Sequence, residues 1–275
     1  MTGPKERLRE LGLAPLKGLG QNFLASPQLA EKIAKEVYRQ GEKNIVVEIG
    51  PGLGALTFPL LDLGLTVYAL EIDRGLAAEL AKNNEATHRS LIILNTDALK
   101  VGLDTLPTGP KTICGNIPYN ISSQVLMWFL STFNGKSPGV FLLQKELVIR
   151  LLASPGSKDY GRITVPMKLF FELSSPFTIA PDAFRPRPKV ESALLVLKPV
   201  LDPPKVDIQK LSAMTKICFH ARRKTLYNNL ISAFAPQEVK KALSQLGLDP
   251  GLRPETLAPE SFAKLAAFFW EDAPS

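Results

Sequence analysis

The sequence has little of the chemistry that binds metals. Among 275 residues there are only two cysteines, Cys114 and Cys218, and two histidines, His88 and His220. These four residues do not show the spacing of a zinc-ligand set. We therefore predict no metal site, two buried thiols, and histidines that lie on the surface or on helices.

Long apolar runs are also missing. No stretch is long enough to cross a bilayer, and residues 1–20 are charged and helix-like, without the apolar run of a signal peptide. We expect a cytoplasmic protein that has no contact with membranes. Hydrophobic content of 45% and charged content of 21% are typical of a globular protein, and the length suits one large domain and one small one.

Acidic residues are fewer than basic ones, which gives a net charge of +7 and a pI near 9.3. This excess favours a polyanionic partner but does not identify one. No acid occurs from Ile208 through Gln237. The same stretch contains Lys210, Lys216, Arg222, Arg223 and Lys224. It is either a face that contacts phosphates or a merely solvated basic surface.

Strand-like and helix-like patterns alternate through the first 150 residues. The apolar runs typical of strands cover 45–49, 66–72, 91–94, 112–114 and 140–143, and helical segments cover 27–40, 74–83 and 122–133. Such alternation predicts an α/β fold with a Rossmann-like, mostly parallel sheet covered on both faces. Two later runs, 176–179 and 193–197, have no helix between them, so we predict an antiparallel edge strand.

The chain changes character after Leu201. Pro203 and Pro204 end the last strand and stiffen the exit from it. Beyond them, apolar residues recur at helical spacing. We therefore predict a first domain over 1–201, which includes the N-terminal extension, and a small all-helical domain over 205–275.

Three glycines, Gly50, Gly52 and Gly54, follow the first apolar strand. Glycines here let the backbone approach a ligand closely. Glu71 ends the next strand, where an acid binds ribose hydroxyls in this topology, and Asp97 follows the third strand, where it could accept a hydrogen bond from an adenine amino group. The spacing predicts a nucleoside-containing cofactor.

The glycine spacing alone does not identify that cofactor, because Gly50, Gly52 and Ala55 also satisfy the dinucleotide fingerprint. A nicotinamide-dependent oxidoreductase therefore remains an alternative. Acids at Glu48, Glu71 and Asp97 favour a cationic cofactor instead, since carboxylates attract a sulfonium.

A short stretch after the fourth strand places an amide, a proline and an aromatic ring side by side at Asn116, Pro118 and Tyr119. The amide offers an acceptor and a donor, proline restricts the backbone, and a base can stack on the ring. The stretch suits a flat ring that carries an exocyclic amino group. The alternative is a strand-to-helix turn in which these residues serve only turn chemistry.

Several motifs together resemble the KsgA-type ribosomal RNA adenine N6,N6-dimethyltransferases. They occur in consistent order from Gly18 to the C-terminus: Gly20-Gln-Asn-Phe-Leu24, Glu48-Ile-Gly-Pro-Gly-Leu-Gly54, Leu70-Glu-Ile-Asp73, Asp97-Ala98, Asn116-Ile-Pro-Tyr119, Gln144-Lys-Glu146, Pro155-Gly-Ser-Lys-Asp-Tyr-Gly161, Phe184 to Ser192 and Arg222-Arg-Lys-Thr-Leu226. The resemblance implies a class I methyltransferase that binds S-adenosylmethionine. The residues it implies for that cofactor are Gln21, Asn22, Leu24, Gly50, Gly52, Glu71, Ile72, Asp97, Ala98 and Asn116.

By the same resemblance, the substrate is two adjacent adenosines near the 3′ end of small-subunit ribosomal RNA in an immature subunit. Each would receive two methyl groups on its exocyclic nitrogen during ribosome biogenesis. The catalytic residues would be Asn116, Ile117, Pro118, Tyr119 and Phe184, and RNA-binding residues would be Lys216, Arg222, Arg223 and Lys224. The family usually acts as a monomer.

Two alternatives stay open. The family usually has leucine where Ile117 stands, and isoleucine also occurs in related large-subunit RNA methylases, although the 155–160 stretch and the helical tail favour the small-subunit target. Phe184 could be a core residue instead of a stacking one. A non-catalytic RNA-binding assembly factor on the same fold is a rival function, since fold does not imply activity.

Overall fold

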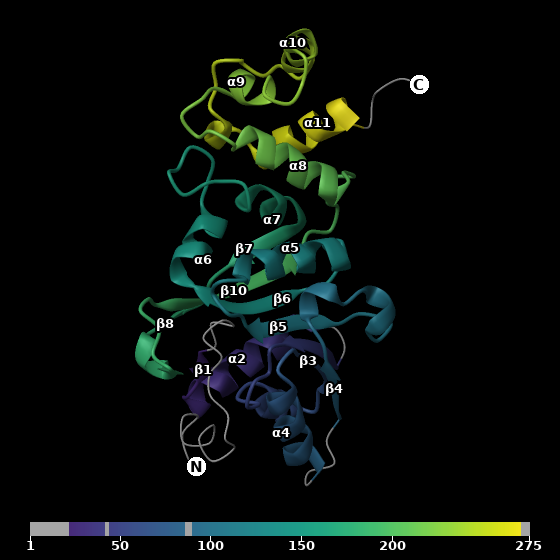
Figure 1. Cartoon of the computed structure of the whole chain (residues 1–275), viewed down its shortest axis with the longest axis vertical. Helices are drawn as coiled ribbons and strands as arrows, with labels where there is room; N and C mark the ends of the chain where they lie inside the picture. The colour runs from purple at the N-terminus through teal and green to yellow at the C-terminus, as the bar shows by residue number, and fades with distance from the viewer. Residues whose placement is uncertain (1–21, 42–43, 86–89, 271–275) are drawn as a thin grey trace. The chain divides into compact units, whose positions relative to one another are not determined.

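The computed structural model describes residues 22–41, 44–85 and 90–270. The chain forms two compact units, and Figure 1 colours it from the N-terminus to the C-terminus. The first unit consists of Met1–Val148 and Ser174–Pro199, and the second of Ile149–Leu173 and Val200–Ser275.

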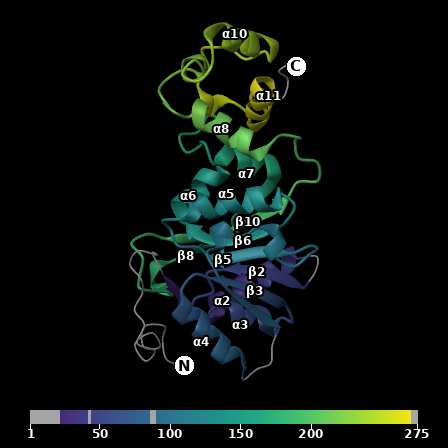
Figure 2. The ribbon, with the colours of Figure 1, turned by 45° about the vertical axis from the view of Figure 1, so that its right-hand side comes forward.

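The sheet of the first unit is built from strands whose bounds are β2 (Ile45–Ile49), β3 (Thr66–Glu71), β4 (Leu91–Asn95), β5 (Thr112–Asn116), β6 (Gly139–Gln144), β8 (Thr178–Ile179) and β10 (Ser192–Pro199). Their order is β4-β3-β2-β5-β6-β10, and the run from β3 to β10 can be followed in Figure 2. Neighbouring pairs from β4 to β6 are parallel, while β10 pairs antiparallel with β6 and β8. The predicted α/β fold with an antiparallel edge is confirmed.

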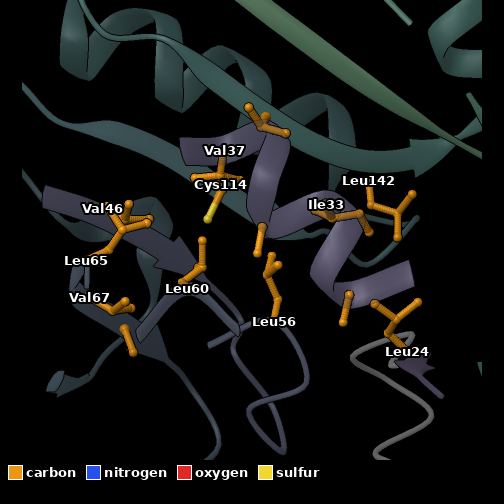
Figure 3. Close-up of a cluster of buried hydrophobic side chains, with 14 of the residues drawn as sticks. Leu24, Ile33, Val37, Val46, Leu56, Leu60, Leu65, Val67, Cys114 and Leu142 are labelled. Atoms are coloured by element: carbon orange, nitrogen blue, oxygen red, sulfur yellow. The ribbon is translucent and has the colours of Figure 1, made fainter. Parts of the chain in front are cut away.

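Helices cover both faces of this sheet; their bounds are α2 (Pro27–Gln40), α3 (Thr57–Asp62), α4 (Arg74–Glu85) and α5 (Ser122–Phe133). On one face, side chains of α2 and α3 pack with Val46, Val67, Cys114 and Leu142 in a continuous apolar cluster, shown in Figure 3. On the other, the ring of Phe129 in α5 lies 5.3 Å from that of Phe141 in β6, centroid to centroid. Continuous apolar strands therefore have a partner on each side, as parallel sheets require.

The start of α2 follows from its sequence. The Ser26 hydroxyl accepts a hydrogen bond from the Leu29 backbone N–H at 3.3 Å, and Pro27 occupies the first helical position. Both are standard devices for beginning a helix, and the predicted range 27–40 is confirmed.

Two elements of the first unit carry no sequence signal. The two-residue strands β1 (Phe23–Leu24) and β9 (Phe184–Arg185) pair antiparallel, with Leu24 opposite Phe184. Strands this short show no apolar alternation, so only the three-dimensional structure reveals the pair. Its consequence is that the chain before α2 is fixed against the segment that precedes β10.

The second unit consists mainly of helices, whose bounds are α7 (Thr164–Phe170), α8 (Ile208–Cys218), α9 (Leu226–Leu230), α10 (Pro236–Gln245) and α11 (Pro259–Trp270). Helices α8 to α11 all lie beyond Pro204, where the sequence predicts helices. The α7 helix packs against α8 and α11, so residues 149–173 belong to this compact unit although the sequence division placed them before residue 201. In sequence, the boundaries between the two units fall within α6 (Lys145–Leu152) and β7 (Phe171–Ser174). The division into domains at 201–205 stays a prediction.

The described residues also bear on the predictions made for the cysteines, the histidines and membrane-spanning segments. Cys114 and Cys218 are buried free thiols, as predicted, and His220 is exposed. His88 lies outside the described residues. No helix in the described part of the chain has the length and apolarity needed to span a bilayer.

Candidate functional site

A cavity of about 220 Å³ lies at the carboxyl ends of β2, β3 and β5 in the first unit. The strand order reverses between β2 and β5, because β3 continues on one side of β2 and β5 lies on the other. Open α/β sheets bind ligands at this kind of switch point. The cavity combines apolar walls with acids from three strand ends, and its lining includes Leu53, Leu56, Leu99, Ile121, Val125 and Leu142.

The glycine loop forms one wall. Gly50, Gly52 and Gly54 have φ angles of +64°, +59° and +83°, a region that glycine enters without strain. A Cβ on Gly52 would stand 3.0 Å from the Phe23 ring, and one on Gly54 would stand 2.4 Å from the Phe58 ring. A Cβ on Gly50 would meet nothing within 4 Å. The loop is thus packed on one side and open at Gly50, a cavity-lining residue.

Glu71 connects the end of β3 to this loop. One oxygen of its carboxylate accepts a hydrogen bond from the Gly52 N–H at 3.0 Å, and the other accepts from the Asp73 N–H at 2.9 Å. Glu71 is only 3% exposed. Burial raises the pKa of its carboxyl group, and the two backbone hydrogen bonds oppose this rise. The carboxylate is therefore held in a fixed position beside the loop, with lone pairs left over for a ligand hydroxyl.

Glu48 lies beneath the loop and is 2% exposed. Its Oε2 accepts a hydrogen bond from the Thr57 hydroxyl at 2.6 Å. Burial raises the pKa of Glu48 to about 8, the Thr57 hydrogen bond opposes the rise, and the nearby Glu71 carboxylate adds to it. The three acids of the predicted rim therefore differ, because Glu48 is largely protonated at neutral pH.

We expect Glu48→Gln to stabilise the protein above neutral pH. Between pH 4.5 and about 8 the folded chain keeps a proton on Glu48 that the unfolded chain has lost, so the free energy of unfolding falls as the pH rises through this window. Glutamine removes that penalty, which is on the order of 4 kcal/mol at pH 8. Urea unfolding at pH 5 and pH 8 measures the effect. Glu31→Gln, at an exposed acid of α2, should leave the pH dependence of wild type, and an unchanged slope in Glu48→Gln would contradict the prediction.

Asp97 follows β4 and begins a 3-10 turn (Ala98–Lys100). Its Oδ1 accepts a hydrogen bond from the Leu99 N–H at 3.0 Å, which fixes the carboxyl group at the rim of the cavity. A carboxylate accepts several hydrogen bonds, so one that caps a turn still has acceptor capacity for a ligand amino group.

Asn116 is the last residue of β5 and lines the same cavity. Its Nδ2 donates a hydrogen bond to the backbone carbonyl of Asn22 at 2.7 Å. Because a carbonyl can only accept, this contact fixes which end of the amide faces Asn22, and Oδ1 faces the other way. The site thus presents a carbonyl acceptor from Asn116, held by a residue 94 positions away.

The neighbours of Asn116 differ in their surroundings. Pro118 lines the cavity, whereas the Ile117 side chain is buried and its N–H donates to the Leu142 carbonyl at 3.1 Å. Tyr119 is half-buried, and its hydroxyl shares a hydrogen bond of 2.7 Å with the Ser192 hydroxyl. Desolvation raises the pKa of Tyr119, so the phenol stays neutral near pH 7. Tyr119 lies beside the cavity wall and does not line it; stacking on a base stays a prediction.

Phe184 is 1% exposed and packs in the same cluster as Leu24. This position agrees with the alternative of a core residue, and a stacking role would require the ring to move. Through the pairing of β1 with β9, Phe184 holds the segment from Asn22 to Leu24, which lines the cavity.

The structure brings together the predicted cofactor residues that it describes. One of them, Gln21, lies outside the described residues. The others line one cavity: Asn22, Leu24, Gly50, Gly52, Glu71, Ile72, Asp97, Ala98 and Asn116. Their role in binding stays a proposal. Sequence reasoning missed Leu99, Ile121 and Val125 as lining residues, because ordinary apolar residues in turns and helices carry no signal beyond their sequence proximity to a motif.

The predicted RNA-binding residues lie in the second unit. Lys216 is exposed on α8, and Arg222, Arg223 and Lys224 are exposed in the turn between α8 and α9. Within the described ranges, no three side chains of His, Cys, Asp or Glu come together as metal ligands. The absence of a metal from the reaction stays a prediction.

Comparisons with known proteins agree on one family. A family model described as ribosomal RNA adenine dimethylase matches residues 16–271. A curated ribosomal RNA small subunit methyltransferase A from Hahella chejuensis is 38% identical over 266 residues, which cover 95% of this chain and 95% of that protein. The crystal structure of a dimethyladenosine transferase from Plasmodium falciparum is 26% identical with a TM-score of 0.73, and the match covers 88% of this chain and 95% of that one. The 23S rRNA methyltransferase ErmE is 26% identical with a TM-score of 0.64, covering 90% of this chain and 99% of that one.

Proposed function

Because this chain belongs to the ribosomal RNA adenine dimethylase family, we propose that it transfers methyl groups from S-adenosylmethionine to small-subunit ribosomal RNA. The acceptors are the exocyclic nitrogens of two adjacent adenosines near the 3′ end, each methylated twice. The fold is that of a class I methyltransferase, and the enzyme is an rRNA (adenine-N6,N6)-dimethyltransferase. The observation that carries this proposal is that Asn116 lines the cavity at the switch point with its Nδ2 bound to the Asn22 carbonyl, which leaves Oδ1 to accept a hydrogen bond.

The residues of the cavity fit S-adenosylmethionine. Glu71 supplies an acceptor for ribose hydroxyls, Asp97 supplies one for the adenine amino group, and the apolar side chains of the cavity suit a flat ring. Gly50 leaves room for close approach of a ligand to the backbone. When bound, S-adenosylmethionine would supply an electrophilic methyl group on a positively charged sulfur, and the carboxylate of Glu71 makes the cavity favourable for positive charge.

The enzyme's contribution to methyl transfer is positioning. The lone pair of an adenine amino nitrogen is delocalised into the ring, which makes that nitrogen a poor nucleophile. Asn116 Oδ1 and the Ile117 carbonyl accept its N–H bonds and favour a pyramidal nitrogen. With the cofactor bound, these two acceptors would direct the nitrogen lone pair at the methyl group, and the proton that the nitrogen loses would pass to water. Holding nitrogen, carbon and sulfur in line supplies most of the acceleration, with the base unstacked from RNA.

The RNA partner is the small-subunit ribosomal RNA in an immature subunit, and the enzyme acts in the cytoplasm as a monomer. Lys216, Arg223 and Lys224 are exposed cations suited to phosphate contacts. Both the choice of these three residues and the immature state of the subunit are parts of the proposal.

Methylation of unmethylated small ribosomal subunits tests the function. With labelled S-adenosylmethionine, we expect two methyl groups on each of two adjacent adenosines near the 3′ end, mapped by nuclease digestion and mass spectrometry. Subunits that already carry these modifications serve as the matched control and should take up no label. Label in large-subunit RNA would instead favour a 23S rRNA methyltransferase activity, the one named for ErmE, which this chain also resembles. Binding of subunits without any methyl transfer would favour an assembly factor.

A further inference from the structure

Two loops of the second unit are joined by an arginine that the RNA-binding prediction treats as a phosphate contact. The 158 loop is residues 154–161, and the 222 loop is residues 219–225. Arg222 Nη2 donates hydrogen bonds to the carbonyls of Lys158 and Tyr160, the second at 3.2 Å. One side of the guanidinium is therefore occupied by the backbone of the 158 loop, which leaves less of it for a phosphate.

The buried side chain of Asn229, a residue that is 1% exposed, fixes the 222 loop. The Asn229 Oδ1 accepts from the Ala221 N–H at 3.0 Å. Its Nδ2 donates to the carbonyls of Ala221, Lys224 and Thr225 at 3.2, 3.4 and 3.1 Å. A buried amide with acceptor and donors all directed at one turn holds the backbone of that turn, so Arg222 projects from a fixed position.

The 158 loop has further anchors. The Gly156 N–H donates to the Glu255 carbonyl at 2.6 Å, and the Tyr160 ring is fully buried, with its centroid 6.2 Å from that of Phe219. Lys158 is exposed between these anchors. Its backbone is fixed by Arg222, while its ammonium group extends into solvent.

The exposed cations of the two loops have no acidic partner among the described residues. The ion pairs of Arg39 with Glu36 and of Lys145 with Glu191 do not involve Lys158, Arg223 or Lys224. Neighbouring unpaired lysine and arginine side chains on a fixed backbone suit the phosphates of a nucleic acid, and lysine binds phosphate as a point charge.

We propose that Lys158 is a further phosphate contact for the ribosomal RNA and that Arg222 is a positioning residue that places it, while Arg223 and Lys224 contact phosphates directly. This inference rests on the proposed function, because it takes the polyanion to be the RNA that the enzyme methylates. It adds the 158 loop to the binding surface and gives Arg222 a different role from those of its two neighbours.

The experiment measures binding of unmethylated small ribosomal subunits at several salt concentrations. Loss of one phosphate contact should weaken binding about fivefold at 0.15 M salt and reduce the salt slope by about one. We expect this of Lys158→Gln, which changes an exposed side chain and should leave the melting temperature unchanged. Lys241→Gln, the same charge change on α10, is the matched control and should have less than half that effect on the slope. Equal effects of the two variants would overturn the inference.

Two further variants test the role of Arg222. Arg222→Lys keeps the charge but lacks the planar fork, so it should weaken binding as much as Arg222→Gln does if Arg222 positions Lys158. In the Arg222→Gln background, Lys158→Gln should cost less than twofold, because the two residues act together. Additive losses, or an Arg222→Lys variant that binds as wild type does, would overturn the inference. If wild type binds and methylates the subunits, the proposed function holds. Any of the contrary outcomes above would then overturn only the inference about Lys158 and Arg222.

Discussion

Replacing Asn116 by alanine should lower the rate of methyl transfer about 100- to 1000-fold, the usual cost of losing one hydrogen-bonding group aimed at the reacting centre. The reason is that Asn116 lines the cavity and its Nδ2 is already bound to the Asn22 carbonyl, which leaves Oδ1 as the acceptor of this amide. A single-turnover assay with saturating cofactor and small subunits measures the chemical step. Calorimetry on the same variant should find that affinity for S-adenosylmethionine partly survives.

Asn120→Ala is the matched control for this prediction. Asn120 is an exposed asparagine of the same stretch and also lines the cavity. It follows the end of β5 rather than forming its last residue, so we expect a loss of less than about tenfold. An Asn116→Ala enzyme that transfers methyl groups at the wild-type rate would remove Asn116 from the mechanism. So would equal losses in both variants, because a general disturbance of the cavity would then explain them.

Glu71→Ala should weaken binding of S-adenosylmethionine about 100-fold or more. The carboxylate fixes the glycine loop through Gly52 N–H and the end of β3 through Asp73 N–H, and it is the acceptor proposed for ribose. Losing hydrogen bonds to a charged group costs about 1.5–3 kcal/mol each, and two such losses correspond to at least a 100-fold change. Equilibrium binding of the cofactor, measured alongside thermal unfolding, separates affinity from stability.

Two other substitutions sharpen the result. Glu71→Gln keeps one acceptor oxygen and should fall between wild type and alanine. Asp73→Asn removes a charge two residues away while its Oδ1 can still accept from the Gly75 and Leu76 N–H groups, as Asp73 does at 2.8 and 3.1 Å. We expect less than about threefold loss for Asp73→Asn. If it lost as much affinity as Glu71→Ala, local negative charge rather than the Glu71 contacts would account for binding.

Much of the candidate site could be predicted because its residues stand at the ends of consecutive strands. Strands that pair in parallel bring their carboxyl ends to one edge, so Gly50, Glu71 and Asn116 had to come together once the α/β pattern was recognised. The differences among the acids could not be predicted. Glu48 is the next-to-last residue of β2. It is as buried as Glu71, but it accepts from the Thr57 hydroxyl where Glu71 accepts from two backbone N–H groups.

The contacts of Tyr119, Phe184 and Arg222 were harder to predict, because each of them joins residues that are far apart in sequence. Tyr119 meets Ser192, Phe184 meets Leu24, and Arg222 meets the carbonyls of the 158 loop, each across a long separation in sequence. Nothing local to a tyrosine or an arginine indicates whether a distant residue occupies its polar group. The sequence left open whether Tyr119 and Phe184 face substrate or serve the protein's own structure, and the structure shows the contacts that each of the three side chains makes within the protein.

By itself, the sequence determined the fold class, the mostly parallel sheet with an antiparallel edge, and the motifs of the family, since these depend on local periodicity and on turns that require glycine or proline. Tertiary structure alone decided which way the Asn116 amide faces, that Glu48 holds its proton near neutral pH, and that Arg222 fastens one loop to another. Hydrogen-bond partners and desolvation come from chain segments far apart in sequence, so they exist only after the chain has packed.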